Sequence, residues 1–456
     1  MTGADQPAKE VAVLGLGKSG TSAAKLLLSR GSRVYASDAG SSPAVQANAE
    51  SLLALGAEVD VGAHDLARIA RASRVVVSPG IDPHNPPVAA AREARVPLVS
   101  EIEIALGALT NSRIIAVTGT NGKTTTTALI GHLLRGLGLD AVDAGNIGTP
   151  LSDMALRERP PEWIALEMSS FQLHDTPSLA PDVGVLTNLT PDHLDRYSTT
   201  EEYYADKARL FANADAASKW VLNGDDQLVD QMAARAAGEK FRFSTRMRSD
   251  AWLDSTTGNM ILRGDTLMPR SELGLLGDHN VANALASALA VSIADERFAT
   301  TESLASMASA LRSFHALAHR LEIVGEIDGI QWINDSKATN VSSTLVAVMG
   351  MKRPTVLLLG GRHKGEPYTA LTPAIARTVK KVIAYGEAAS EVERDIGNVV
   401  AFERLGSDFE EVIQHARKSA AAGDAVLLSP ACSSFDMFRN YEERGAAFRR
   451  LAMEKP

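Results

Sequence analysis

The chain has little cysteine, few aromatic residues and no long apolar run. Cys432 is the one cysteine among 456 residues, which excludes an internal disulfide and predicts a reducing compartment. We expect it to be a small buried thiol, because no base is paired with it. No run of about 18 apolar residues occurs, and the N-terminus lacks an apolar signal region. The sequence therefore predicts a cytoplasmic protein without membrane insertion.

The charge and size of the chain narrow its class further. Its formal net charge is −9, and its pI is near 5.7, which argues against nucleic acid or an anionic membrane as the main partner. Hydrophobic residues make up 45% of the chain, enough for large cores. The length exceeds what one core supports, so about two to four domains are expected.

The most informative stretch is 114–128, IIAVTGTNGKTTTTA. Its β-branched start predicts a buried parallel strand, and the helix that follows opens at Lys123. The glycines between them allow backbone N–H groups to surround a phosphate, with Lys123 at the β/γ-phosphates and the Thr124 hydroxyl on Mg²⁺. Val117 stands where a strict motif has its first glycine, so Gly119 must take that role. The stretch predicts nucleoside triphosphate binding.

A second glycine-rich loop lies near the N-terminus. The strand predicted at 11–14 is followed by GLGKSG at 15–20, a helical stretch, and a strand at 33–37 that ends in Asp38. This pattern is typical of loops that bind nucleotide diphosphates. An NAD site and a site for another nucleotide both remain open on these residues alone, and a dehydrogenase would leave Lys123 without a role.

Polar residues follow several other predicted strands. The strand at 74–77 leads into Ser78-Pro79-Gly80, and the strand at 163–166 delivers Glu167, a candidate metal ligand. A polar cluster, TNLTPDHLDRY, follows the strand at 183–186. Prolines at 83, 86 and 87 are expected to interrupt any helix there.

The remainder of the chain reads as alternating strands and helices. Residues 201–211 form an amphipathic helix whose Lys207 is expected to be exposed on pattern alone. Residues 241–276 are predicted to be rich in strands. Strands at 332–334, 355–359, 381–386 and 425–428 then predict another parallel α/β layer.

Eight motifs together resemble the Mur ligase family: GTNGKTTT, LEMSSFQL, TNLTPDHLDRY, DHNVANALA, HRLE, NDSKATN, GGRHKG and SPACSSFDMFRNYEERG. The resemblance implies three α/β domains. These are a Rossmann-like UDP-sugar-binding domain at 1–101, a P-loop ATPase-like ATP-binding domain at 102–316, and a Rossmann-like amino-acid-binding domain at 317–456. NDSKATN and the last motif favour the member that adds D-glutamate to UDP-N-acetylmuramoyl-L-alanine.

The resemblance also assigns roles to individual residues. Those implied to bind ATP are Gly119, Thr120, Asn121, Gly122, Lys123, Thr124, Thr125, Asn280, Asn283, Arg320 and Asp335. Those implied to bind the UDP-substrate are Leu16, Lys18, Asp38, Ser78, Pro79, Gly80, Asn146 and His193. Those implied to bind the amino acid are Lys337, Thr339, Lys364, Ser434 and Tyr441. The implied catalytic residues are Lys123, Glu167, His193 and Lys207.

The implied reaction forms an amide through an acyl phosphate, with ATP as the phosphoryl donor. Two Mg²⁺ ions are implied, one on Thr124 and Glu167 and one on His193 and Lys207, with Lys207 as a carbamate formed from CO₂. The enzyme is expected to act as a monomer in peptidoglycan synthesis. The alternative is a related Mur-type or folylpolyglutamate-type ligase that takes another amino acid, L-glutamate included.

Overall fold

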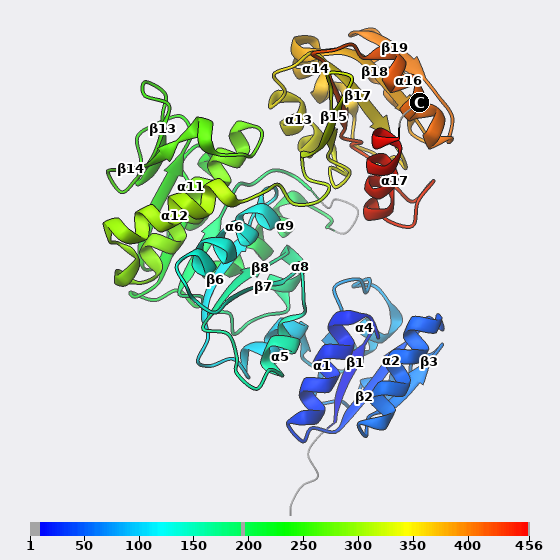
Figure 1. Cartoon of the computed structure of the whole chain (residues 1–456). Helices are drawn as coiled ribbons and strands as arrows, with labels where there is room; N and C mark the ends of the chain where they lie inside the picture. Colours follow the sequence, from blue (N-terminus) through cyan, green and yellow to red (C-terminus); the bar gives the residue numbers. More distant parts are fainter. Residues whose placement is uncertain (1–9, 193–196, 455–456) are drawn as a thin grey trace, which may run out of the picture. The chain divides into compact units, whose positions relative to one another are not determined.

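The computed structural model describes residues 10–192 and 197–454, and it is built from three β-sheets with helices between their strands (Figure 1). The chain divides into two compact units. The first unit runs to Pro269 and also contains Asn283–Leu311, and the second contains Arg270–Ala282 and the chain from Arg312 onward. The expected α/β fold class is confirmed, and the described residues form three sheets, as three α/β domains require.

The first sheet has five parallel strands in the order β3-β2-β1-β4-β5. Its central strand is buried along its whole length, as its continuous apolar sequence predicts. The strands are β1 (Val11–Leu14), β2 (Val34–Asp38), β3 (Glu58–Val61), β4 (Arg74–Val77) and β5 (Leu98–Val99). The helices are α1 (Lys18–Ser29), α2 (Pro43–Ala54), α3 (Leu66–Ile69) and α4 (Pro86–Glu93).

The prediction that prolines prevent a helix after residue 83 is wrong. Helix α4 begins at Pro86, with Pro87 in its next position and Asn85 as its N-cap residue. A proline in the first turn of a helix loses no hydrogen bond, because the N–H groups there have no partner within the helix. The proline pair therefore starts the helix.

The middle sheet has nine strands in the order β14-β13-β12-β11-β10-β9-β6-β8-β7. Strands β6 to β12 pair in parallel, and β13 and β14 extend the sheet as an antiparallel meander. The strands are β6 (Arg113–Thr118), β7 (Ala141–Gly145), β8 (Trp163–Glu167), β9 (Val183–Leu186), β10 (Lys219–Asn223), β11 (Glu239–Ser244), β12 (Ala251–Asp254), β13 (Asn259–Leu262) and β14 (Asp265–Pro269). The last four confirm the strand-rich prediction for 241–276.

Helices occupy the connections of the middle sheet and follow its meander. They are α5 (Glu101–Leu106), α6 (Lys123–Gly136), α7 (Leu151–Ala155), α8 (Ser170–His174), α9 (Thr200–Ala208), α10 (Gln227–Ala233), α11 (Asp278–Ala294) and α12 (Thr301–Ser313). Short 3₁₀ turns are η1 (Arg209–Phe211), η2 (Arg270–Glu272) and η3 (Glu296–Phe298). Helix α11 crosses the boundary between the two units, because its residues up to Ala282 belong to the second.

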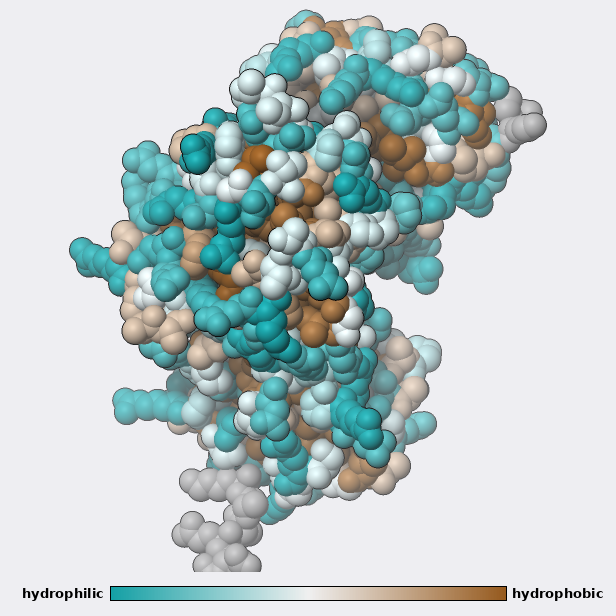
Figure 2. Space-filling view, turned by 60° about the vertical axis from the view of Figure 1, so that its left-hand side comes forward, coloured by the Kyte–Doolittle hydropathy of each residue, from teal (hydrophilic) through white to brown (hydrophobic). Residues whose placement is uncertain are grey.

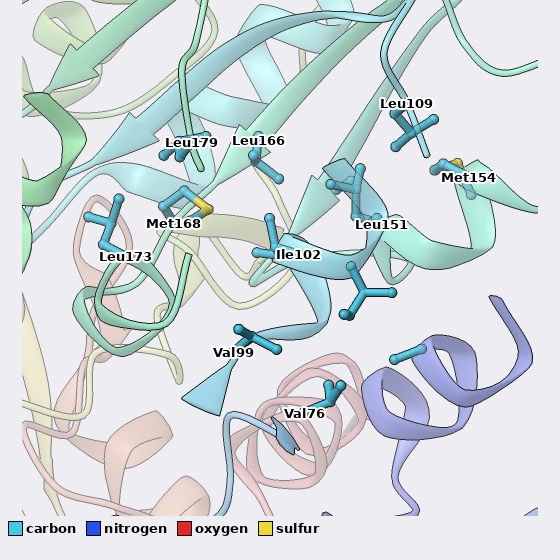
Figure 3. Packing of buried hydrophobic residues seen from close by; sticks show 14 of the residues in the cluster. Val76, Val99, Ile102, Leu109, Leu151, Met154, Leu166, Met168, Leu173 and Leu179 are labelled. Carbon is cyan, nitrogen blue, oxygen red and sulfur yellow. The ribbon is translucent and has the colours of Figure 1, made fainter. Parts of the chain in front are cut away.

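One hydrophobic core joins the first and middle sheets into the first unit. Figure 3 shows Val76 and Val99 of the first sheet near Ile102 of α5, which in turn lies near Leu151 of α7 and Leu166 of β8. These side chains are all buried in a single cluster. Burial of apolar surface stabilises a protein by about 25 cal/mol per Å², so this shared core holds the two sheets together.

The third sheet forms the second unit and has the order β15-β16-β20-β17-β18-β19. Only β15, at one edge of the described sheet, is antiparallel to its neighbour. The strands are β15 (Glu322–Ile327), β16 (Ile330–Asn334), β17 (Thr355–Gly360), β18 (Val379–Tyr385), β19 (Ala401–Arg404) and β20 (Ala425–Leu428). The helices are α13 (Val341–Met349), η4 (Tyr368–Leu371), α14 (Thr372–Thr378), α15 (Ala389–Ile396), α16 (Phe409–Ser419) and α17 (Tyr441–Met453).

The single thiol and the surface agree with the composition. Cys432 is buried as predicted; its Sγ lies 2.9 Å from the Tyr368 hydroxyl, and burial raises the pKa of the thiol to about 11. On the face shown in Figure 2, hydrophilic residues predominate and hydrophobic ones occur in small groups. No helix in the described part of the chain is long and apolar enough to cross a bilayer.

Candidate active site

The loop after β6 has the geometry of a phosphate-binding loop. Gly119 and Gly122 have φ angles of +143° and +83°, which favour glycine. A Cβ at Gly119 would collide with Thr187, and one at Gly122 would press on the Asn283 amide. Gly122 also caps helix α6, so main-chain N–H groups and the helix N-terminus meet at this loop. The structure thus gives Gly119 the constrained position that the sequence required of it.

Two lysines share one acceptor in this loop. The Lys123 Nζ donates to the carbonyls of Gly119 (3.0 Å) and Thr120 (2.7 Å), and the Lys207 Nζ donates to the same Gly119 carbonyl at 2.6 Å. Lys207 is only 1% exposed, so the prediction of an exposed helix lysine is wrong. Its stem lies in the helix face that packs on the loop, with Nζ 4.6 Å from the Tyr203 ring centroid. Burial, and then the charge of Lys123, hold the pKa of Lys207 well below its ordinary value.

Several residues that hold the loop escaped the sequence prediction. The Asn188 side chain accepts from Asn121 N at 2.8 Å and donates to Asn121 O at 2.9 Å, and the Thr187 hydroxyl donates to Asn121 O at 2.6 Å. The buried Tyr203 hydroxyl donates to Thr120 Oγ1 at 3.2 Å. Thr187 and Asn188 follow β9 at the same sheet edge as the loop, and Tyr203 precedes Lys207 by one helical turn. The places of Thr187 and Asn188 after a strand, and of Tyr203 one turn before Lys207, were the sequence features that could have identified them.

Glu167 ends β8 with a carboxylate that fits a metal ion. It is 1% exposed; its Oε1 accepts from Asn146 Nδ2 at 2.9 Å, and its buried Oε2 has no hydrogen-bond partner among the described residues. A buried carboxylate oxygen without a donor is costly and suits a cation. Thr124, the second predicted ligand, is buried at the start of α6. His193, the predicted ligand of the second ion, lies outside the described residues.

These ligands fit a Mg²⁺ ion that is also bound by water and phosphate better than a metal held by protein side chains alone. Over residues 10–192 and 197–454, no three His, Cys, Asp or Glu side chains converge as a ready-made metal site. Mg²⁺ commonly binds one or two carboxylates and completes its shell with water and substrate phosphates. The Glu167 carboxylate oxygen and the Thr124 hydroxyl, both beside a phosphate loop, match this coordination.

The loop after β1 is built on an internal carboxylate. Asp38 Oδ2 accepts from Leu16 N and its Oδ1 accepts from Gly40 N, both at 2.7 Å. The Leu16 carbonyl accepts from Asn48 Nδ2 at 2.7 Å, and the Leu16 side chain is fully buried. One oxygen of Asp38 therefore holds the backbone of the loop after β1, and the other holds the turn that follows β2.

A cavity of about 170 Å³ in the first unit brings three predicted UDP-substrate residues together. Lys18 of α1, Pro79 after β4 and Asn146 after β7 all line it. Ser78 and Pro79 also line a neighbouring cavity of about 310 Å³, and the Ser78 hydroxyl donates to Gly15 O at 3.2 Å. Because Asn146 both lines the smaller cavity and contacts Glu167, the cavity and the buried carboxylate of Glu167 are directly linked.

In the second unit, the buried Asp335 holds the backbone next to the half-buried Arg320. Asp335 Oδ1 accepts from Leu321 N at 3.2 Å and its Oδ2 accepts from Ser429 Oγ at 2.8 Å. Burial raises the pKa of Asp335 to about 7. Leu321, with a φ of +43°, directly follows Arg320, so Asp335 fixes the backbone that carries this arginine.

The two predicted asparagines of α11 fall in different units. Asn280 Nδ2 donates to Leu276 O at 2.8 Å in the second unit. Asn283 Oδ1 accepts from Thr126 Oγ1 at 3.3 Å in the first unit. Asn283 is thereby placed against the phosphate loop and its helix.

The predicted amino-acid residues lie on loops at one edge of the third sheet, except Tyr441, which begins α17. Lys337 Nζ lies 5.3 Å from the ring centroid of Tyr441, and Lys364 Nζ donates to Thr339 Oγ1 at 3.4 Å. Ser434 follows β20 and is buried. These loops come after β16, β17 and β20, which are neighbours in the sheet, so their carboxyl ends meet at the same edge.

Comparison with known sequences decides the family. Three sequence models match: "Mur ligase MurD-like, N-terminal domain" over residues 9–100, "Mur ligase middle domain" over 117–291, and "Mur ligase, glutamate ligase domain" over 319–432. The chain is 38% identical to the UDP-N-acetylmuramoylalanine–D-glutamate ligase of Acidobacterium capsulatum, over 98% of this chain and 96% of that protein. It is 41% identical to the ligase of the same name from Salinibacter ruber, over 96% of each. The chain belongs to the Mur ligase family.

Solved structures of Mur ligases share its fold. The UDP-N-acetylmuramate-alanine ligase MurC of Thermotoga maritima aligns with a TM-score of 0.62 over 98% of this chain and all of that one, at 19% identity. MurF of Acinetobacter baumannii aligns with a TM-score of 0.62 over 92% of this chain and 91% of that one, at 16% identity. At these identities the agreement concerns the Mur ligase fold, while the assignment to the family rests on the sequences.

Proposed function

We propose that this Mur ligase joins D-glutamate to UDP-N-acetylmuramoyl-L-alanine at the expense of ATP, as a monomer in the cytoplasmic phase of peptidoglycan synthesis. The observation that carries the proposal is the contact between Asn146 and Glu167. It connects the cavity assigned to the UDP-substrate with the acid assigned to the metal, beside the phosphate loop. The full-length relatives that bear this ligase name support the choice of substrates.

The first step activates a carboxylate. An oxygen of the L-alanyl carboxylate attacks the γ-phosphorus of ATP, the bond to the bridging oxygen breaks, and ADP leaves with that electron pair. Two anions approach each other, so the Lys123 ammonium at the loop neutralises charge and holds the phosphates in line. Mg²⁺ held by Thr124 and Glu167 would supply further charge neutralisation for the phosphate oxygens.

The second step forms the amide. The glutamate amine attacks the carbonyl carbon of the acyl phosphate, and a tetrahedral intermediate collapses with loss of phosphate and a proton. No protein nucleophile is needed, because phosphate is already a good leaving group. We assign Lys337, Thr339, Lys364, Ser434 and Tyr441 to binding of the incoming glutamate. Correct positioning of the amine supplies much of the catalysis.

We further propose that Lys207 is carbamylated. A neutral amine attacks CO₂, forms a bond from nitrogen to carbon and loses a proton, which converts a cationic side chain into an anionic one. The buried setting of Lys207 favours the neutral amine that this step requires. The product would present carboxylate-like oxygens to a second Mg²⁺, together with His193.

The test is ATP-dependent phosphate release with UDP-N-acetylmuramoyl-L-alanine and Mg²⁺. D-glutamate, L-glutamate, L-lysine and diaminopimelate are supplied in separate reactions. Release with D-glutamate alone is expected. Release with L-glutamate alone would keep the reaction class and replace the amino acid, and release with none would contradict the proposed function.

A further inference from the structure

Arg444 of α17 is a buried cation that is bound by main-chain carbonyls and a serine hydroxyl. Its exposed fraction is 0%, although a guanidinium group keeps its charge at any ordinary pH. No carboxylate of the described residues forms an ion pair with it. Asp335, whose carboxyl senses this charge, makes its own hydrogen bonds to Leu321 and Ser429. Burying an unpaired charge is costly, so its retention needs a reason.

The guanidinium of Arg444 binds three separate loops. Its Nε donates to Ser336 Oγ at 3.0 Å and its Nη2 to Ser336 O at 2.8 Å. Both Nη atoms donate to Cys432 O at 3.2 Å. Its Nη1 also donates to Ser433 O at 3.4 Å and to Gly360 O at 3.5 Å. These acceptors follow or end β16, β20 and β17, so one side chain connects three neighbouring strand ends.

The surroundings of Arg444 leave little freedom. The Ser336 hydroxyl donates to Tyr441 O at 2.8 Å, which returns the network to the start of α17. A Cβ at Gly361 would lie 3.1 Å from Arg444 Nη1 and would collide with the Ser433 carbonyl. Arg362 N donates to that carbonyl at 2.9 Å, which ties the loops together a second time.

Each of these loops carries a residue assigned to the amino acid. Lys337 directly follows Ser336, Ser434 directly follows Ser433, and Lys364 lies four residues beyond Gly360. The incoming glutamate bears two carboxylates, and a buried cation behind the loops makes the pocket favourable for anions.

We propose that Arg444 is a positioning residue for amino-acid binding. It fixes the relative placement of the three loops, and its charge favours an anionic amino acid. This inference rests on the proposed function, because the pocket it organises is the one assigned to glutamate. A lysine cannot reproduce the arrangement, since it offers three donors at one point where arginine offers five in a planar fork.

The kinetic test uses Arg444→Lys, which keeps the charge, and Arg444→Met, which removes it. Arg417→Lys is the matched control, because Arg417 also donates to main-chain carbonyls of this unit, those of Leu451 and Ala452. We expect the KM for D-glutamate to rise about tenfold or more in Arg444→Lys and further in Arg444→Met. The KM for ATP should change by less than about twofold in all three variants.

A structural readout separates this inference from the proposed function. In Arg444→Lys, the amides of 336–340, 361–365 and 433–436 should exchange with deuterium faster than in the unmodified protein, while those of β17 and β20 keep their rates. If both Arg444 variants fail to fold, Ser336→Ala removes one acceptor and should give the same loop effect more weakly.

The outcomes are distinct. Equal increases in the KM of all substrates, or unchanged exchange in the three loops, would overturn the role of Arg444. Failure of the unmodified enzyme with every amino acid would overturn the proposed function, and the exchange measurement would still decide whether Arg444 holds the loops.

Discussion

The two glycine-rich loops of the first unit share one plan and use their acids differently. Both follow a buried parallel strand and lead into a helix near a lysine, Lys18 in one and Lys123 in the other. In the first loop, Asp38 uses both carboxylate oxygens on main-chain N–H groups. In the second, Glu167 keeps one buried oxygen without a hydrogen-bond partner among the described residues. The first acid therefore builds its loop, and the second is available to a cation.

Lys18 and Lys123, the lysines of the two loops, also differ in what they contact. Lys18 lines the cavity assigned to the UDP-substrate. Lys123 donates to the Gly119 carbonyl of its own loop, which also accepts from Lys207. A strand, a glycine-rich loop and a helix are thus common to both sites, and the contacts of the surrounding acid and lysine distinguish them.

The largest effect is expected from Lys123→Ala. Loss of the ammonium at the transferred phosphoryl group should lower kcat by about 10³-fold or more without unfolding the protein. Phosphate release and thermal unfolding measure the two quantities. Lys18→Ala is the matched control and should act mainly through the KM of the UDP-substrate. Near-normal activity of Lys123→Ala would remove the ATP-site assignment.

Lys207→Ala should also be inactive, and small carboxylic acids such as acetate should restore part of the activity. The reason is that a free carboxylate can occupy the place of the proposed carbamate. Activity is measured with and without added acid, and mass spectrometry of the unmodified protein under CO₂ checks for the carbamate. Full activity of the variant without any acid would disprove the carbamate.

Glu167→Gln should lower kcat by about a hundredfold, because the amide preserves the shape of the side chain and removes its charge. The Mg²⁺ concentration required for half-maximal activity should rise. Asp38→Asn serves as the control and should leave the Mg²⁺ requirement unchanged. An unchanged Mg²⁺ requirement in Glu167→Gln would assign the metal to other ligands.

The smallest effect is expected from Asp38→Asn. An asparagine can accept only one of the two N–H groups without a clash of donors, so the free energy of unfolding should fall by about 1–2 kcal/mol. Denaturant unfolding measures this loss, and the effect on kcat should be slight. A large loss of kcat with unchanged stability would mean that Asp38 acts on substrate rather than on its loop.

The sequence predicted the elements more fully than the surroundings of individual side chains. The apolar runs before Gly15 and Gly119 were sufficient to place β1 and β6, because strands buried on both faces are continuously hydrophobic. Lys207 shows the limit: its place in an amphipathic helix predicted exposure, and only the resemblance to Mur ligases placed it in the site. Its burial depends on packing against a loop that lies 88 residues earlier in the chain.

The surroundings of Arg444 were not predicted because they depend on hydrogen bonds between residues far apart in the sequence. Nothing local to Arg444 reveals that three strand ends meet around it, because its acceptors are main-chain carbonyls up to 108 residues away. Pro86 was misjudged for a different reason: the effect of proline depends on its position within the helix, and the boundary of α4 was not visible in the sequence.

The buried thiol of Cys432 can serve as a natural probe of how often the second unit opens. It is the only thiol of the chain, its side chain has no exposed surface and contacts the Tyr368 hydroxyl, and its carbonyl accepts from Arg444. A maleimide or similar reagent can therefore modify the protein only after this unit opens. The rate of labelling then measures how often the structure around Cys432 in the second unit opens, without any engineered probe.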